Sequence, residues 1–196
     1  MKPITQDWLK EQSQNTDIDP AIREDLLAMV SNGHANGTST GYLQARTGTI
    51  SVSGTNGKWD RKKQEKKFTY SVDGDFENWN TVGKNDKPTA TIKAQCHDLI
   101  KDGMYSQIIP DEPVNFFQNA TQALQVIHDN QALADEVLQN DKRIHLPFVN
   151  ADGDKFVANV FKHDGRLGVY VLEFSNVLVW LAEFGYVFVF PLQVTQ

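Results

Sequence analysis

The strongest constraint on the fold lies in the last third of the chain, where strand-like segments flank an Asp-Gly turn. Asp164-Gly165 is a dipeptide that two-residue hairpin turns favour, because both central residues of such a turn need a positive φ. Apolar and polar residues alternate before and after it, as in half-buried strands. We therefore predict a hairpin here, and an antiparallel sheet over residues 144–192.

Residues 177–192 are the most apolar run of the chain and contain one charge, Glu183. A membrane-spanning helix needs about 20 apolar residues, whereas this run has 16 and is interrupted at Glu183 and Gly185. Its Val, Phe, Tyr and Trp residues favour strands that are covered on both faces. We predict a buried strand pair with Trp180 and Phe188 in the core, and a membrane-inserted segment is the alternative.

Helices are indicated in two regions. Asp19 is a good N-cap before Pro20, and Asn32-Gly33 can end the helix that follows. Pro113 marks the start of a second helical region with an apolar stripe, followed by a shorter helix over residues 133–138.

Between these regions the sequence has the texture of strands. Residues 49–53 and 68–72 alternate, and Asn56-Gly57 suggests a type I′ hairpin turn. Residues 89–94 are expected to return as a further strand. The fold class we predict is α+β, with N-terminal and central helices packed on a mainly antiparallel sheet and a β-rich C-terminal third.

The length of 196 residues fits a single domain, residues 1–196. A sub-division is the alternative, with a helix and hairpin in residues 1–100 and a helical hairpin and sheet in 101–196. Cys96 is the one cysteine and cannot form an internal disulfide, which suits a reducing compartment. The first residues lack the apolar run of a signal peptide, so we expect a cytoplasmic protein.

The net charge of -6 is unevenly distributed. Residues 1–100 contain 13 basic and 13 acidic residues, whereas residues 101–196 contain 6 basic and 12 acidic ones. An acidic balance keeps a protein soluble and argues against general affinity for nucleic acid.

The basic run 58–67 is the least ordinary feature of the chain, with six Lys or Arg residues and two acids. Aromatic residues lie within it and just after it, and basic residues interleaved with aromatics are typical of proteins that bind single-stranded nucleic acid. The favoured interpretation is nevertheless a solvated hairpin arm whose lysines prevent edge-to-edge pairing, because the chain as a whole is acidic. The candidate binding residues are Lys58, Trp59, Arg61, Lys62, Lys63, Lys66 and Lys67.

The other candidate sites fail on spacing. Gly33, Gly37 and Gly41 do not form a nucleotide-binding loop, because a helix precedes them and strands follow. The carboxylates of residues 73–77 and 150–154 resemble cation sites, but Asp-Gly turns explain both clusters. We expect no metal and no cofactor.

Catalytic motifs are equally weak. The five histidines form no zinc-binding pair, and no serine elbow occurs. Cys96 and His97 are adjacent and would point to opposite faces of a strand. An enzyme with a site assembled from distant residues stays an alternative.

These observations favour a small interaction or regulatory protein that binds a macromolecular partner, as inhibitors, immunity proteins and phage regulators do. A protein partner is expected, with single-stranded nucleic acid as the alternative partner of residues 58–70. Neither an activity nor a membrane association is expected, and the oligomeric state is left open.

Overall fold

The computed structural model describes residues 41–70, 83, 86–139 and 142–192. These residues belong to one compact unit. The predicted helix after Asp19, the Gly-rich loop up to residue 40 and the carboxylates of residues 73–77 lie outside the described residues.

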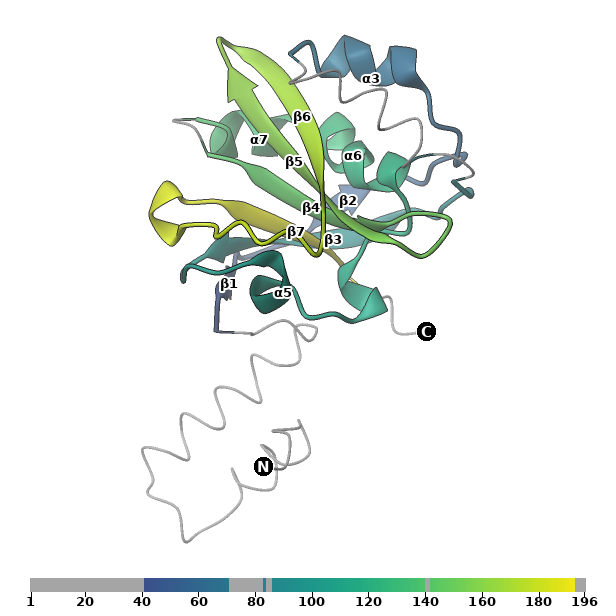
Figure 1. Cartoon of the computed structure of the whole chain (residues 1–196). Coiled ribbons are helices and arrows are strands. Elements are labelled where there is room, and N and C mark those ends of the chain that lie inside the picture. The colour runs from purple at the N-terminus through teal and green to yellow at the C-terminus, as the bar shows by residue number, and fades with distance from the viewer. Residues whose placement is uncertain (1–40, 71–82, 84–85, 140–141, 193–196) are drawn as a thin grey trace, which may run out of the picture. The chain divides into compact units, whose positions relative to one another are not determined.

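The described part is an α+β fold built on a seven-stranded sheet, as predicted (Figure 1). The strand order is β1-β3-β7-β4-β5-β6, and β2 pairs with the same edge of β3 as β1 does. All pairs are antiparallel except β4 with β7, which is parallel, so the sheet is mixed. The strands are β1 (Leu43–Ala45), β2 (Ile50–Val52), β3 (Ile92–Leu99), β4 (Ile144–Val149), β5 (Lys155–His163), β6 (Arg166–Glu173) and β7 (Val187–Leu192).

Helices cover both faces of the sheet. Figure 1 shows α3, α6 and α7 on one side and α5 on the other. Residues that alternate along one strand therefore enter two separate cores: Val187 and Val189 face the first group of helices, and Phe188 and Phe190 face α5. The helices are α3 (Arg61–Lys67), α5 (Tyr105–Ile108), α6 (Ala120–Asp129) and α7 (Gln131–Val137), with 3-10 turns η1 (Pro113–Asn115) and η2 (Ala182–Phe184).

Helix α6 is the main support of the first core. Asn119 caps it by accepting a hydrogen bond from the backbone N–H of Gln122 at 2.8 Å. Leu124 and Ile127 are fully buried against the sheet. Asn130 ends α6 and begins α7, which confirms the predicted interruption between the two helices. The predicted start of this helix was early, because Pro113 opens only a 3-10 turn.

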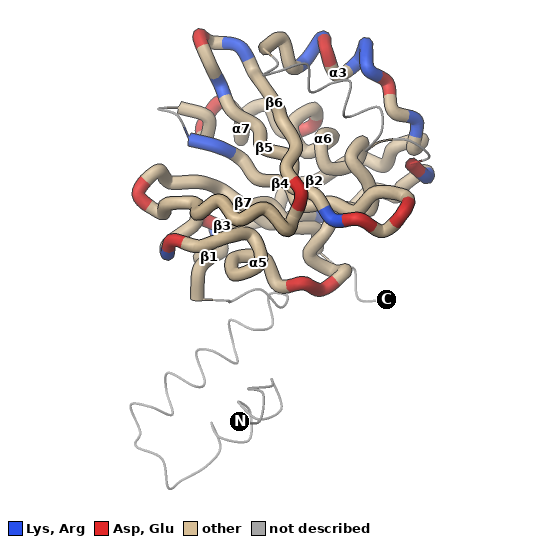
Figure 2. Tube along the Cα trace, in the orientation of Figure 1, with Lys and Arg blue, Asp and Glu red and all other residues tan. Residues whose placement is uncertain are grey.

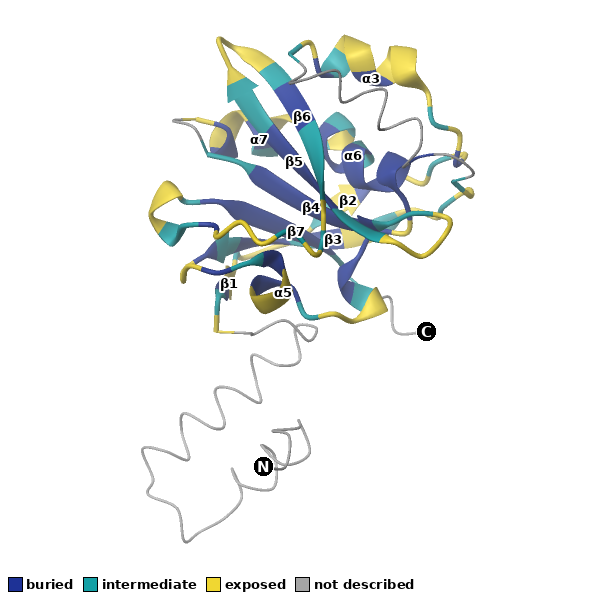
Figure 3. Ribbon diagram, in the orientation of Figure 1, coloured by how far each residue is buried: buried dark blue, intermediate teal, exposed yellow. Residues whose placement is uncertain are grey.

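The Asp164-Gly165 hairpin is confirmed. The φ angles of Asp164 and Gly165 are 48° and 75°, and β5 pairs with β6 on either side of them. Strands β4, β5 and β7 are mostly buried and form the centre of the sheet, which confirms the β-rich C-terminal third (Figure 3).

The predicted strand pair in residues 177–192 is wrong in its first half. Only β7 is a strand, and the segment before it is irregular apart from η2. The reason is that β7 inserts between β3 and β4 and runs parallel to β4, so its partners come from distant parts of the chain. The core positions are nevertheless confirmed, since Trp180 is 5% exposed and Phe188 is fully buried. Among the described residues, no helix is long and apolar enough to cross a membrane.

The predicted hairpin between residues 49–53 and 68–72 is also wrong. β2 pairs with β3, and Gly57 has the expected positive φ of 73° but leads into a helix. A Cβ at Gly57 would lie 2.2 Å from the backbone of Lys87, so this loop packs too closely for any other residue.

Candidate binding site at helix α3

The basic run forms a short helix, α3, and not the hairpin arm considered above. Asp60 caps its first turn, with Oδ1 accepting from the backbone N–H of Lys63 at 3.0 Å. Arg61 and Glu65 form an ion pair one turn apart, with Nε and Oε1 separated by 2.6 Å. The cap, the pair and a run of good helix-forming residues explain why this segment is helical.

One face of α3 is fixed to α6 through a buried polar contact. Gln64 is 1% exposed, and its Oε1 lies 2.9 Å from Nε2 of His128. Phe68 follows in the core and meets the His128 ring edge-on, with ring centroids 6.1 Å apart. The helix therefore has an anchored inner face.

His128 stays neutral in this position. Burial lowers its pKa to about 4, and the nearby charges of Lys63 and Lys67 add to the effect. Because Gln64 Oε1 can only accept, the neutral ring donates from Nε2.

The lysines of the run divide into two groups. Lys63 donates from Nζ to Gln125 Oε1 at 3.1 Å, and Lys67 donates to Gln131, so both lie over α6 and α7. Lys58, Lys62 and Lys66 are exposed, and their ammonium groups make no hydrogen bond or ion pair with the described part of the chain. Lys62 and Lys66 are four positions apart and share one outward face of α3. Figure 2 shows this concentration of basic residues along the helix.

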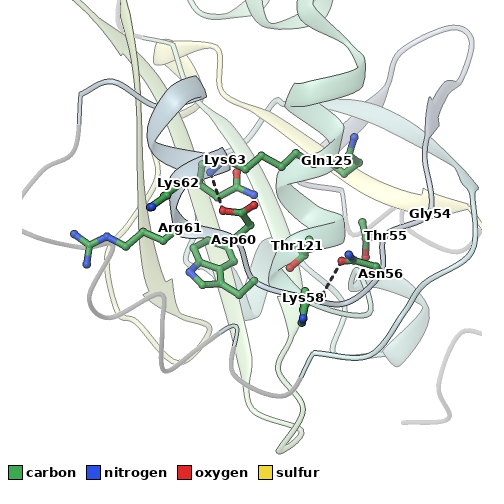
Figure 4. A pocket seen from close by; sticks show the side chains of 12 residues that line it. Gly54, Thr55, Asn56, Lys58, Asp60, Arg61, Lys62, Lys63, Thr121 and Gln125 are labelled. Atoms are coloured by element: carbon green, nitrogen blue, oxygen red, sulfur yellow. Dashed lines mark hydrogen bonds between the residues drawn. The ribbon is translucent and has the colours of Figure 1, made fainter.

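A cavity of about 690 Å³ opens beside the first turn of α3. Its walls are residues 54–56 and 58–60, the start of α3 and the α6 residues Thr121 and Gln125 (Figure 4). Asn56 lines it and holds the loop by accepting from the backbone N–H of Lys58 at 2.9 Å. Amide and ammonium groups, which are donors suited to carboxylate or phosphate oxygens, surround this space together with the carboxylate of Asp60.

Asp86 lies behind this wall. Its Oδ2 accepts from the backbone N–H and the hydroxyl of Thr121, at 3.4 Å and 3.2 Å. Burial raises the pKa of Asp86 to about 6, against the opposing effect of these two hydrogen bonds. At neutral pH its carboxylate therefore places some negative charge near a largely basic cavity.

Trp59 lines the cavity as a fixed wall. It is half-buried and packs against the helix-side core. Gly83 lies on its ring, since a Cβ at that position would come within 3.0 Å of an indole carbon. Phe68 is 2% exposed, and Tyr70 packs edge-on against Phe161. The aromatic residues of the run are therefore engaged in packing.

The structure brings five of the seven predicted binding residues to the cavity. Lys66 and Lys67 lie at the other end of α3 and do not line it. Thr121 and Gln125 were missed, because their contribution depends on packing α6 beside α3 and leaves no local pattern in the sequence. The cavity residues predicted from the sequence are Lys58, Trp59, Arg61, Lys62 and Lys63.

The other candidate sites have structural explanations. Cys96 and His97 face opposite sides of β3, and burial raises the pKa of the Cys96 thiol to about 11, which disfavours the nucleophilic thiolate. Asn150 Oδ1 accepts from the backbone N–H groups of Asp152 and Asp154 at 3.0 Å and 2.8 Å, closing a turn. Within the described ranges, no group of side chains has the arrangement of a metal site.

A second polar cluster is buried under α5. The Tyr105 hydroxyl donates to Asn159 Oδ1 at 2.9 Å and lies 3.1 Å from His145 Nδ1. Burial, followed by the charge of Arg143, lowers the pKa of His145 well below its ordinary value. His145 is fully buried and stacked on Phe188, with centroids 4.5 Å apart, so this cluster stabilises the core and is closed to ligands.

Comparison of the chain with protein-family models, with curated proteins and with solved structures gave no match.

Proposed function

We propose that this chain is a binding protein that docks an acidic segment of a partner protein on α3 and the adjacent cavity. One observation supports this most strongly. Lys62 and Lys66 on α3, and Lys58 in the loop before it, project ammonium groups that have no partner within the described residues, and Gln64 holds α3 to α6. Unpaired cations next to a cavity lined mostly by basic and amide side chains suit carboxylates on a neighbouring chain.

Single-stranded nucleic acid is the less favoured ligand. Such binding uses aromatic side chains on which bases stack. Here Trp59 is a cavity wall with Gly83 on its ring, and Phe68 is buried. The net charge of -6 also opposes the long-range attraction of a polyanion. A short acidic protein segment needs only the local positive charge at α3.

The expected affinity is modest. Exposed ion pairs contribute roughly 0–1 kcal/mol each, so three lysines alone give weak binding. The cavity adds the side-chain amide of Asn56 as a donor, held in place by the hydrogen bond between Asn56 Oδ1 and the backbone N–H of Lys58, whereas the Thr121 hydroxyl already donates to Asp86. Electrostatic complementarity of this kind raises the association rate and makes binding sensitive to salt.

The test is a fluorescence-anisotropy titration of a labelled oligoglutamate peptide with the full chain at low salt. Reversing charge at α3 with Lys62→Glu and Lys66→Glu should weaken binding about tenfold or more, because two attractive contacts become repulsive. The control is Lys93→Glu with Lys101→Glu, which changes the net charge equally at exposed positions on and after β3. The control should bind as the unmodified chain does.

Two outcomes contradict the proposal. Equal weakening in both double variants would mean that only net charge matters, and absence of peptide binding would leave α3 without this role. Labelled oligothymidylate is titrated in parallel. Tight binding of that probe, with a loss of about 1–3 kcal/mol on Trp59→Ala, would instead favour nucleic acid.

A further inference from the structure

Four of the five large exposed apolar side chains of the described residues lie on one segment. Val177, Leu178, Val179 and Phe184 are 79%, 53%, 56% and 45% exposed, and all belong to the connection between β6 and β7. Ile100, 53% exposed, is the fifth and lies three residues before Gly103. We name these five residues the apolar patch. Scattered apolar residues on a surface are ordinary, but four of them within eight positions of one segment form a concentration of the kind that marks a contact site.

The segment that presents the apolar patch is firmly attached. Gly103 and Trp180 exchange two backbone hydrogen bonds, of 3.1 Å and 2.8 Å. Asp102 Oδ1 accepts from the backbone N–H of Ala182 at 2.8 Å. Trp180 and Tyr186 are almost fully buried beneath the segment and pack edge-on, with centroids 5.4 Å apart. The exposed side chains therefore project from an anchored segment.

The backbone of the same segment offers hydrogen-bonding groups. The N–H groups of Val177 and Val179, and the carbonyl groups of residues 177–179, have no hydrogen-bond partner within the part of the chain that the structure describes. Unpaired backbone beside apolar, β-branched side chains is a template for pairing with another chain.

We infer that the apolar patch is the contact face of a symmetric dimer of this chain. Residues 174–182 contain no charge, so two copies can meet about Leu178 without placing like charges at the centre. Glu173 and Glu183 lie at the two ends of this run, where a surrounding rim stays in water. A patch of five side chains is smaller than a stable dimer interface requires, so the dimer should be weak and concentration-dependent.

Charge also decides against other occupants. The acids at both ends of the run and the net charge of -6 disfavour an anionic lipid surface. A head-to-tail contact of the apolar patch with α3 is disfavoured because the exposed face of α3 is basic and offers no apolar counterpart. Figure 1 shows α3 well separated from η2. The α3 helix of each copy therefore remains accessible in the dimer.

The test is sedimentation velocity of the full chain over a roughly hundredfold range of concentration. The unmodified chain should shift from monomer to dimer and go no further. Val177→Asp should weaken dimerisation about a hundredfold or more, because the two-fold axis buries the new charge twice. Val177 is largely exposed, so folding is retained, which circular dichroism and the melting temperature verify. Ala151→Asp adds the same charge in the exposed β4–β5 turn and should leave dimerisation unchanged.

Salt gives a second, independent readout. Added sodium chloride should strengthen the dimer, because it screens repulsion between the acidic rims and leaves apolar contact intact. A chain that is monomeric at every concentration overturns the inference, whether or not it then binds lipid vesicles. Dimerisation that Val177→Asp leaves unchanged, growth beyond the dimer, or dissociation by salt together with sensitivity to Lys62→Glu, overturns it equally.

Discussion

Replacing Trp180 with alanine should be among the most destabilising single changes in the described part of the chain. Trp180 closes the α5 side of the sheet, with its ring 4.5 Å from His145 and 5.2 Å from Tyr105 between centroids. A buried aromatic side chain removes about 150–250 Å² from water, which at about 25 cal/mol per Å² corresponds to roughly 4–6 kcal/mol.

The indole N–H reduces this value. It is buried and has no acceptor among the described residues, and such a group costs about 1–3 kcal/mol. The two effects together predict that Trp180→Ala lowers the free energy of unfolding by about 3–4 kcal/mol, within the range of about 3–5 kcal/mol for such substitutions in cores. Urea unfolding followed by circular dichroism measures this directly, with the slope compared between variants.

Trp180→Phe is the matched control. Phenylalanine keeps most of the ring contacts and removes the unpaired N–H, so the loss should be about 1 kcal/mol or less. A loss in the free energy of unfolding of less than about 1 kcal/mol for Trp180→Ala would show that the side chain is not part of the core. A control as damaging as the alanine variant would show that the indole N–H has a partner.

Three further predictions concern the surroundings of α3. Gln64→Ala should cost about 1–3 kcal/mol in urea unfolding, because it leaves His128 Nε2 without its hydrogen bond, whereas Gln125→Ala, which removes only surface hydrogen bonds with Lys63 and Asp129, should cost under about 0.5 kcal/mol. The folded-state pKa of His128 is about 4, against an ordinary value of 6.5, so the free energy of unfolding should fall as the pH drops from about 6.5 towards 4. Because the ring is only partly buried, solvent screening reduces the expected loss to about 1–2 kcal/mol. His128→Gln should remove this part of the pH dependence. The carboxyl group of Asp86 lowers stability at high pH instead, since its pKa is raised from 3.8 to about 6 in the folded chain. Asp86→Asn should therefore stabilise the fold by about 1 kcal/mol above pH 6 and by nothing below pH 4. An unchanged melting temperature at neutral pH would contradict this.

Local signals in the sequence were enough for part of the fold. The Asp164-Gly165 turn, the α6 and α7 helices and the buried positions Trp180 and Phe188 depend on contacts close in sequence or on strong apolar character. Hairpins with Asp-Gly turns encode both their turn and their register within a few residues. Such features are legible because neighbouring residues decide them.

The remainder depended on distant contacts. The Asn56-Gly57 signal was correct about the positive φ of Gly57 alone and wrong about a hairpin, because the partner of β2 is β3, about forty positions further on. The run after residue 176 was apolar enough for two strands, but β7 alone found neighbours in the sheet. Composition gave no indication that the first half would stay on the surface.

The candidate site was predicted only in part for the same reason. Six basic residues in ten positions identified the run 58–67. The cavity beside it exists because Gln64 meets His128 and because Thr121 and Gln125 lie across from the loop. Charge density along a sequence shows where an anion can bind, whereas the shape of the site follows from how α6 packs.

The most direct test of the central claim is an amide chemical-shift titration of the isotopically labelled chain with the oligoglutamate peptide. Binding as proposed predicts progressive shifts at Lys58, Lys62 and Lys66, and at Thr121 and Gln125 across the cavity. The same titration of the chain with Lys62→Glu and Lys66→Glu should show these shifts reduced at every peptide concentration. Shifts confined to residues 177–179, or an absence of shifts around the cavity at low salt, would contradict the account.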